Sequence, residues 1–116
     1  MPRNVLFIVT GDPRNSGRPA EAIRIAAGVG AWHQVNVTVY LRGPAVLALS
    51  RSAEEFTDAD AYARFLPMLG EREQSVYVQE GAPGPGNLGE AQLPYQTLSE
   101  AGLAELTAGS DYVLRF

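Results

Sequence analysis

The residues best suited to chemistry follow the first apolar run of the chain, residues 5–9 (VLFIV). The next segment, residues 11–18 (GDPRNSGR), carries a carboxylate, a guanidinium, an amide and a hydroxyl, on Asp12, Arg14, Asn15 and Ser16. With the free amide groups at the start of a following helix, these side chains suit an anion. The alternative is ordinary turn chemistry, because Asp, Asn and Ser commonly bind the backbone of turns.

Two further segments are expected to lie beside this turn. Arg42-Gly43-Pro44 follows the alternating run 35–41 (VNVTVYL), and residues 79–86 follow the strand-like run 75–79 (SVYVQ). In open parallel sheets, ligands bind where loops leave the carboxyl ends of the strands. We therefore predict a site for a small anionic ligand or a partner protein at this edge. Its candidate residues are Asp12, Arg14, Asn15, Ser16, Arg42, Gln79 and Glu80.

Residues for nucleophilic catalysis are scarce. The chain has no cysteine, and its nine basic residues are all arginine. Cysteine nucleophiles, thiolate metal sites, Schiff-base lysines and phosphate-loop lysines are thereby excluded. The one histidine, His33, falls between an expected helix and an expected strand, at the amino edge of the sheet and opposite the predicted site. Ser16 with Asp12 is the one nucleophile–carboxylate pair close in sequence, and capping explains both residues better.

We accordingly predict no catalytic residue and, since no His–carboxylate cluster is present, no metal site. A small hydrolase or transferase using carboxylate chemistry is the enzymatic alternative. A flavin or nucleotide site is another, because TGDPRNSG occupies the place of the phosphate-binding loop in flavodoxin-like proteins. Its spacing is not GxGxxG, and Pro13 and Pro19 lack the backbone donors that such a loop uses. We expect no cofactor.

Composition predicts the broad class. At 116 residues, 46% of them hydrophobic and 19% charged, the chain is expected to form one domain, residues 1–116. Its formal net charge of −4 argues against a nucleic-acid partner, which normally requires a basic patch. No apolar run approaches the roughly 18 residues of a membrane span, and no secretory signal pattern is visible. We expect a cytoplasmic protein with no membrane partner.

The first elements can be placed from periodicity. Residues 5–9 have no polar alternation, which is typical of a parallel strand covered on both faces. Pro19 occupies the expected first position of a helix, with Ser16 and Asp12 as candidate caps. That helix should bury Ile23, Ala26, Ala27 and Gly30, which recur at helical spacing.

The middle of the chain predicts an alternating strand over 35–41, a short helix over 45–49 and an exposed connection over 51–55. Thr57 is the expected N-cap of the next helix. Pro67 should disturb the last turn of that helix or end it early, and Gly70 is its expected C-cap. The apolar stripe of this helix is Ala59, Tyr62, Ala63, Leu66 and Leu69.

The remainder predicts a strand over 75–79, a long irregular segment over 80–94 and a short strand over 95–98. Ser99 is the expected N-cap of a helix over 100–107 that Gly109 closes, and residues 111–116 form the last strand. This order of elements predicts a three-layer α/β/α sandwich with a mainly parallel sheet.

Three stretches carry a family resemblance: VLFIVTGDPRNSGRPAEAIRIAAG, VNVTVYLRGPAVLAL and LSEAGLAELTAGSDYVLRF. They cover well over half of the chain, and in them it resembles the DsrE/DsrF-like family, small α/β proteins that include sulfur-relay subunits. The resemblance implies a five-stranded, mainly parallel sheet flanked by helices. It also implies assembly into trimers, hexamers or hetero-oligomers.

Sulfur-carrying members of that family hold a cysteine persulfide on the loop after the third strand. Here that loop reads Gln79-Glu80-Gly81-Ala82-Pro83 and has no thiol. Because neither Gln nor Glu can carry sulfane sulfur, the resemblance implies a non-catalytic relative. The alternative is a scaffolding subunit of a sulfur-relay-type complex whose other member supplies the cysteine. Tyr40, Tyr95 and the Gly/Pro-rich segment 80–94 are the candidates for subunit contact.

Overall fold

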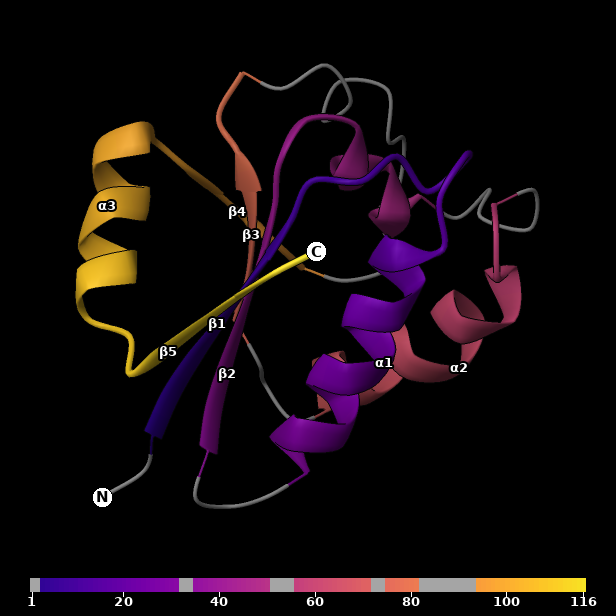
Figure 1. Ribbon diagram of the computed structural model, residues 1–116, viewed down its shortest axis with the longest axis horizontal. Coiled ribbons are helices and arrows are strands. Elements are labelled where there is room, and N and C mark those ends of the chain that lie inside the picture. The colour runs from indigo at the N-terminus through magenta and orange to yellow at the C-terminus, as the bar shows by residue number, and fades with distance from the viewer. Residues whose placement is uncertain (1–2, 32–34, 51–55, 72–74, 82–93) are drawn as a thin grey trace.

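The computed structural model describes residues 3–31, 35–50, 56–71, 75–81 and 94–116. The expected elements are present and follow one another in the predicted order (Figure 1). They are β1 (Arg3–Val9), α1 (Arg18–Gly30), β2 (Val35–Leu41), the 3-10 helix η1 (Gly43–Leu49), α2 (Ala59–Glu71), β3 (Ser75–Gln79), β4 (Gln96–Leu98), α3 (Glu100–Ala108) and β5 (Tyr112–Arg115).

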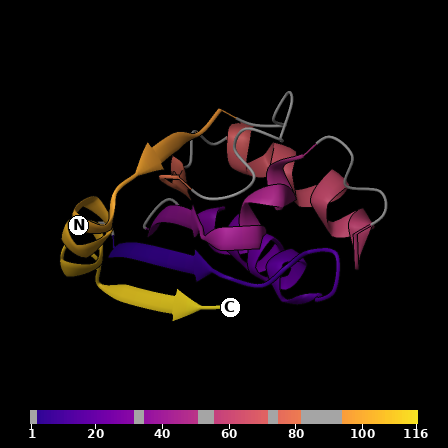
Figure 2. The same ribbon diagram turned by 90° about the horizontal axis from the view of Figure 1, so that it is seen from above.

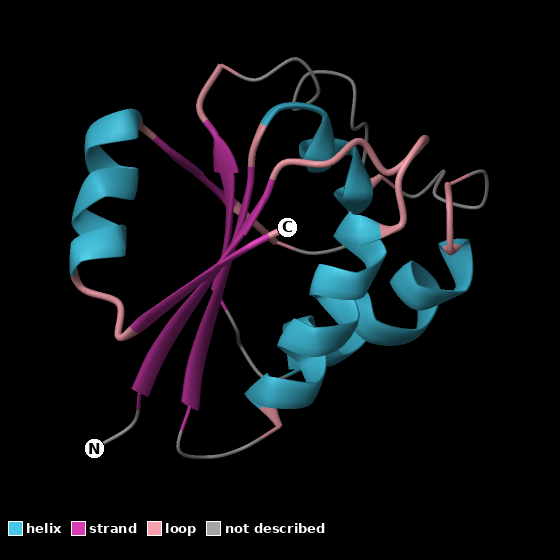
Figure 3. Cartoon of the chain, viewed as in Figure 1, coloured by secondary structure: helices cyan, strands magenta, loops and turns pink. Residues whose placement is uncertain are grey.

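The five strands form one sheet in the order β4-β3-β2-β1-β5, and every neighbouring pair is parallel. Helices α1 and α2 and the helix η1 lie on one face, whereas α3 lies alone on the other (Figures 1 and 3). The three-layer α/β/α sandwich with a parallel sheet of five strands is therefore confirmed. The chain crosses from β4 at one edge to β5 at the other by way of α3.

Strand β1 is covered on both faces, as its unbroken apolar run predicts. Val5, Phe7 and Val9 belong to the larger core beneath α1 and α2, and Leu6 and Ile8 to a smaller core beneath α3. Leu6 and Phe7 are both 0% exposed. Burying each of these side chains contributes roughly 1.5–3 kcal/mol to the stability of the fold. Because β1 supplies residues to both clusters, it connects the two cores.

Helix α1 buries Ile23, Ala26 and Ala27 as expected, while Gly30 is half-buried. It begins at Arg18, one residue earlier than predicted, and its N-cap position is Gly17, without a side-chain cap. Ser16 Oγ instead accepts a hydrogen bond from the Arg18 amide at 3.1 Å. The expected cap by Asp12 is wrong, because the Asp12 carboxylate bonds within its own turn.

Helix α2 differs from prediction at both ends. It begins at Ala59, so the N-cap position falls on Asp58, with a φ of +57°, and not on Thr57. The helix runs through Pro67 to Glu71, so neither the early end nor the C-cap at Gly70 is observed. Tyr62, Leu66 and Leu69 are buried as predicted, but Ala63 is exposed.

The lone helix α3 covers the second face of the sheet, where Leu103 and Leu106 pack against Tyr40 of β2 and its neighbours on β1. Ser99 caps α3 as predicted by accepting a hydrogen bond from the Gly102 amide at 3.1 Å, and Gly109 is its C-cap. Tyr40 is 0% exposed in the single chain. The expectation that Tyr40 contacts another subunit is therefore wrong, while Tyr95 is half-buried against the larger core.

Pro67 is exposed within α2 and has no amide hydrogen for the helical bond to the residue four positions earlier. We expect Pro67→Ala to raise the free energy of unfolding by up to about 3 kcal/mol, because it restores that bond and relieves the ring's clash with the preceding turn. Urea unfolding followed by circular dichroism measures the change. A less stable Pro67→Ala variant would contradict this account of α2.

Tyr62 is fully buried, and its hydroxyl has no hydrogen-bond partner in the described part of the chain. Its ring meets Phe56 edge-on, with centroids 5.8 Å apart. We expect Tyr62→Phe to raise the free energy of unfolding by about 1–3 kcal/mol at pH 7, because it removes an unpaired buried polar group. Tyr112→Phe, at a tyrosine that is 56% exposed, is the matched control and should leave stability nearly unchanged.

The same variant has a pH signature. Burial, with the nearby charge of Asp58, raises the pKa of the Tyr62 phenol above the ordinary 10.0. The folded state therefore keeps a proton that the unfolded chain releases, so this residue's contribution to stability falls as pH rises above about 10. Tyr62→Phe should show a shallower loss of stability at alkaline pH, and an unchanged slope would count against the assignment.

Candidate functional site

The first group of predicted site residues forms a closed turn between β1 and α1. The Asn15 and Ser16 amides donate to the Asp12 carbonyl at 3.0 and 2.9 Å. Arg14 donates its Nε and Nη2 to the two carboxylate oxygens of Asp12 at 3.0 and 2.9 Å, and its amide to one of them at 2.9 Å. The Asn15 side-chain amide reaches the same carboxylate at 3.4 Å.

Within this cluster of Asp12, Arg14 and Asn15, the charges of Asp12 and Arg14 compensate each other. The hydrogen bonds from Arg14 hold the pKa of Asp12 below its ordinary 3.8, and Asp12 in turn raises the pKa of Arg14. The bidentate pair occupies the Nε–Nη2 edge of the guanidinium and neutralises its charge within the turn. The turn chemistry considered as the alternative therefore accounts for these residues.

The second group lies at the carboxyl end of β2, on the face that α3 covers. Arg42 Nη1 is 2.7 Å from Glu100 Oε1 in the first turn of α3 and 3.5 Å from the Tyr40 hydroxyl. Burial of its ring is the main cause that raises the pKa of Tyr40, and the bond to Glu100 raises the pKa of Arg42. Arg42 is thus a cation held at the edge by an exposed carboxylate.

Gln79 ties the end of β3 to the end of β2. Its Oε1 accepts a hydrogen bond from the Gly43 amide at 2.9 Å, and Gly43 has a φ of +58° that favours glycine. Glu80, the next residue, is exposed, and its amide donates to the Leu98 carbonyl of β4 at 3.1 Å. Gln79 therefore shapes the backbone beside Arg42.

The predicted constellation is thus divided. Asp12, Arg14, Asn15 and Ser16 belong to the turn that packs against the start of α2, where the Thr57 amide donates to the Pro13 carbonyl at 3.0 Å. Arg42 and Gln79 belong to the α3 side of the sheet. Between the two groups, the described residues show no side-chain bond. Residues 82–86 of the third segment, and His33, lie outside the described residues.

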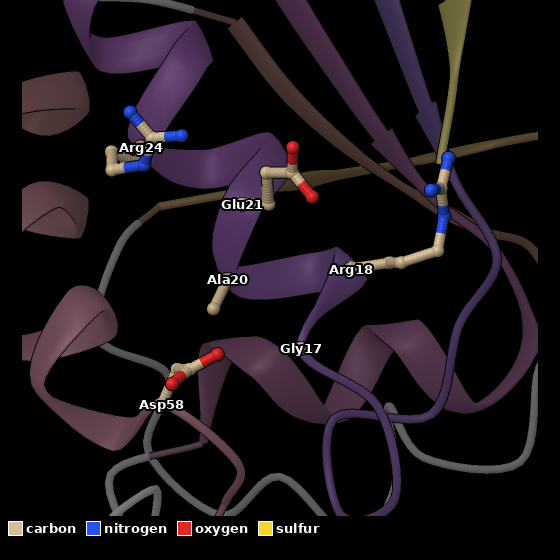
Figure 4. Close-up of a pocket in the computed structure, with 6 residues that line it drawn as sticks. All are labelled: Gly17, Arg18, Ala20, Glu21, Arg24 and Asp58. Atoms are coloured by element: carbon tan, nitrogen blue, oxygen red, sulfur yellow. The ribbon is translucent and has the colours of Figure 1, made fainter.

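A hollow that the sequence did not predict lies beside the first turn of α1. It has a volume of about 440 Å³ and is lined by Gly17, Arg18, Ala20, Glu21, Arg24 and Asp58 (Figure 4). Its two arginines and two carboxylates balance in charge. A Cβ on Gly17 would come within 2.6 Å of Asp58 Oδ2, so a larger residue there would displace the Asp58 carboxylate. None of these six residues is among the predicted site residues.

Arg18 has a packing role at the same edge. Its guanidinium lies 5.4 Å from the centre of the Phe116 ring and donates to the Arg115 carbonyl at 3.3 Å. Phe116 in turn stacks on Phe7, with centroids 5.9 Å apart. Among the described residues, no three His, Asp or Glu side chains gather in a way that could hold a metal ion. No helix there is long and apolar enough to cross a membrane.

The coupling of Asp12 to Arg14 can be tested by titration. We expect Arg14→Gln to raise the pKa of Asp12, because the variant loses the charge-assisted hydrogen bonds that lower it. In the wild type, the stability contributed by this pair is present above the ordinary pKa of 3.8 and is lost as pH falls through the lowered value. Carboxyl NMR of Asp12 measures the shift. An unchanged pKa would contradict the bidentate geometry.

Comparisons with known proteins place the fold. No protein-family model matches the sequence, and no curated protein matches it. Among solved structures, the chain is similar to the ychN protein from E. coli, with a TM-score of 0.78 and 19% identity over 98% of this chain and 99% of that one. At this identity the likeness concerns the fold alone. The chain has the DsrE/DsrF-like fold that the resemblance in sequence implied.

Proposed function

We propose that this chain is a non-catalytic binding protein of the DsrE-like fold, and that it binds a small anionic ligand at the carboxyl edge of the sheet through Arg42. The observation that carries the proposal is the Arg42–Glu100 pair. A guanidinium stands at the edge where parallel sheets bind ligands, and a carboxylate from the chain itself contacts it at 2.7 Å. The protein's own carboxylate marks the position that an anion would occupy.

Replacing Glu100 with a ligand at Arg42 should cost little free energy. The side chains of Arg42 and Glu100 are 37% and 65% exposed, and ion pairs of such exposure contribute little to stability. Arg42 offers five N–H donors in a planar fork, whereas only Nη1 is engaged among the described residues. A carboxylate, phosphate or sulfate could accept from the remaining donors without disturbing the backbone that Gln79 braces.

The other arginines of this edge support the choice of Arg42. Both donor groups of Arg14 that face Asp12 are used by its carboxylate. Arg18 is engaged with Phe116 and the Arg115 carbonyl. The absence of cysteine and lysine from the whole sequence supports binding over covalent catalysis. The alternative function, a scaffolding subunit, is tested by the same measurements.

The decisive variants are Arg42→Gln and Arg14→Gln, which change the net charge equally at the same edge. Titration of phosphate, sulfate and acetate at constant ionic strength, followed by calorimetry and by amide NMR shifts at Gly43, measures binding. We expect Arg42→Gln to weaken anion binding by about tenfold or more, because a charge-assisted bond is lost. Arg14→Gln should retain the wild-type affinity.

Removing the internal competitor should act in the opposite direction. We expect Glu100→Gln to tighten anion binding by no more than about fivefold, in keeping with the small strength of exposed ion pairs. Glu105→Gln, which makes the same charge change on α3, is the control and should have a smaller effect. If none of these anions binds, or if Arg42→Gln and Arg14→Gln weaken binding equally, the anion site is wrong and the scaffolding alternative gains.

A further inference from the structure

Strand β5 exposes apolar side chains at the margin of the sheet. Tyr112 is 56% exposed and Leu114 is 40% exposed, and these are the exposed large hydrophobic residues of the described chain. In the β1–β5 register they stand opposite Val5 and Phe7, so both lie on the face of α1 and α2. Neither belongs to the core on that face. Edge strands usually carry polar or charged residues there, because an apolar edge invites pairing with another chain.

The outer backbone edge of β5 is unpaired at Val113 among the described residues, whereas the Arg115 carbonyl accepts a hydrogen bond from Arg18 Nη2 at 3.3 Å. Phe116 donates its amide to the Ile8 carbonyl at 2.8 Å and accepts from the Thr10 amide at 2.8 Å, so both its backbone groups face β1. Backbone groups of alternate residues in a strand point to opposite sides, and hence those of Val113 and Arg115 face away from β1. Figure 2 shows β5 at the margin of the sheet, with no described strand beyond it.

The opposite edge of the sheet does not share these features. Strand β4 has only three residues, and Gln96 and Thr97 are exposed and polar. A short polar strand is one of the common protections against edge pairing. The apolar, unprotected edge is therefore a feature of β5 and not of β4. Such an edge is suited to pair with a strand from another chain.

We infer that β5 pairs antiparallel with β5 of a second copy of this chain, with Val113 opposite its own counterpart on a two-fold axis. The charges on the strand are self-complementary in this register. Arg115 ends β5 two residues after Val113, and Asp111, whose Oδ2 accepts a hydrogen bond from the Asn4 amide at 2.7 Å, lies two residues before Val113. Each Asp111 therefore stands opposite the partner's Arg115, and the contact is made twice. Tyr112 meets the partner's Leu114 on the same face, which covers both exposed side chains.

The hydrogen-bond accounting also favours this register. The Val113 amide and carbonyl of the two copies bond each other across the axis. The Asp111 amide, which would otherwise need a partner, already donates to the Asn4 carbonyl at 2.7 Å. The Arg115 carbonyl already accepts from Arg18 Nη2 at 3.3 Å. A register shifted to place Val113 opposite Arg115 would compete with that bond and would lose the charge pairing.

A two-fold contact requires an even number of subunits. It allows a dimer, or a hexamer in which two trimers are joined, and it excludes an isolated trimer. The inference does not depend on the anion site, because β5 contributes no side chain to the Arg42 cluster. If either the anion site or the β5 contact is contradicted, the other can still be tested.

The charge pairing is tested with Arg115→Asp on the full chain. We expect sedimentation velocity to show an even multiple of the subunit mass for the wild type and half of that mass for Arg115→Asp, because two carboxylates then face each other. The double variant Asp111→Arg with Arg115→Asp should restore the larger mass. Arg24→Asp, the same charge change at an exposed residue of α1, is the control and should leave the mass unchanged.

The register is tested separately with single cysteines, since the chain has none of its own. An antiparallel pair without mutual hydrogen bonds brings Cα atoms to about 4.5 Å, within disulfide range. We expect Tyr112→Cys and Leu114→Cys to form a covalent heterodimer when mixed and oxidised, and neither to link with itself. A monomeric or trimeric wild type, an unchanged mass for Arg115→Asp, or self-linking of either cysteine variant would overturn the inference.

Discussion

Burial of β1 on both faces is the constraint on which the rest of this structure depends. Its odd-numbered residues form the floor of the larger core and its even-numbered residues that of the smaller one. Helices are therefore required on both sides of the sheet, because an apolar strand face left in water would forfeit its burial. The path of the chain from β4 through α3 to β5 meets this need on the second face and places β5 beside β1.

That same crossing creates the candidate site. Because α3 starts beside the end of β2, its first residue, Glu100, reaches Arg42. The two residues are far apart in sequence, and no local pattern pairs them. The arginines at this edge are bound within the chain to differing degrees, from Arg14, which Asp12 holds through two nitrogens, to Arg42, which Glu100 holds through one. Because Arg42 keeps more of its donors free than Arg14 does, it is the arginine of this edge best suited to bind an anion.

The arrangement of the helices leaves one face of the edge strand β5 exposed. Helix α1 packs over β1 and β2, and α3 serves the opposite face, so the α1 side of β5 has no cover of its own. Phe116, stacked on Phe7 beneath Arg18, is the one aromatic residue of this margin drawn into the core. Tyr112 and Leu114 lie beyond that reach, and a second copy can cover what the single chain leaves exposed.

The sequence by itself determined the class of fold, the order of the elements and most of the core, because apolar periodicity and caps such as Ser99 are local properties. It did not place helix ends correctly at Thr57, Pro67 and Gly70, where tertiary packing outweighs local preference. Only the tertiary structure decided that Tyr40 is buried, that Asp12 neutralises Arg14, and that Arg42 meets Glu100. Those outcomes depend on which face each side chain occupies and on what crosses it, and contacts between distant residues leave no periodic signal in a single sequence.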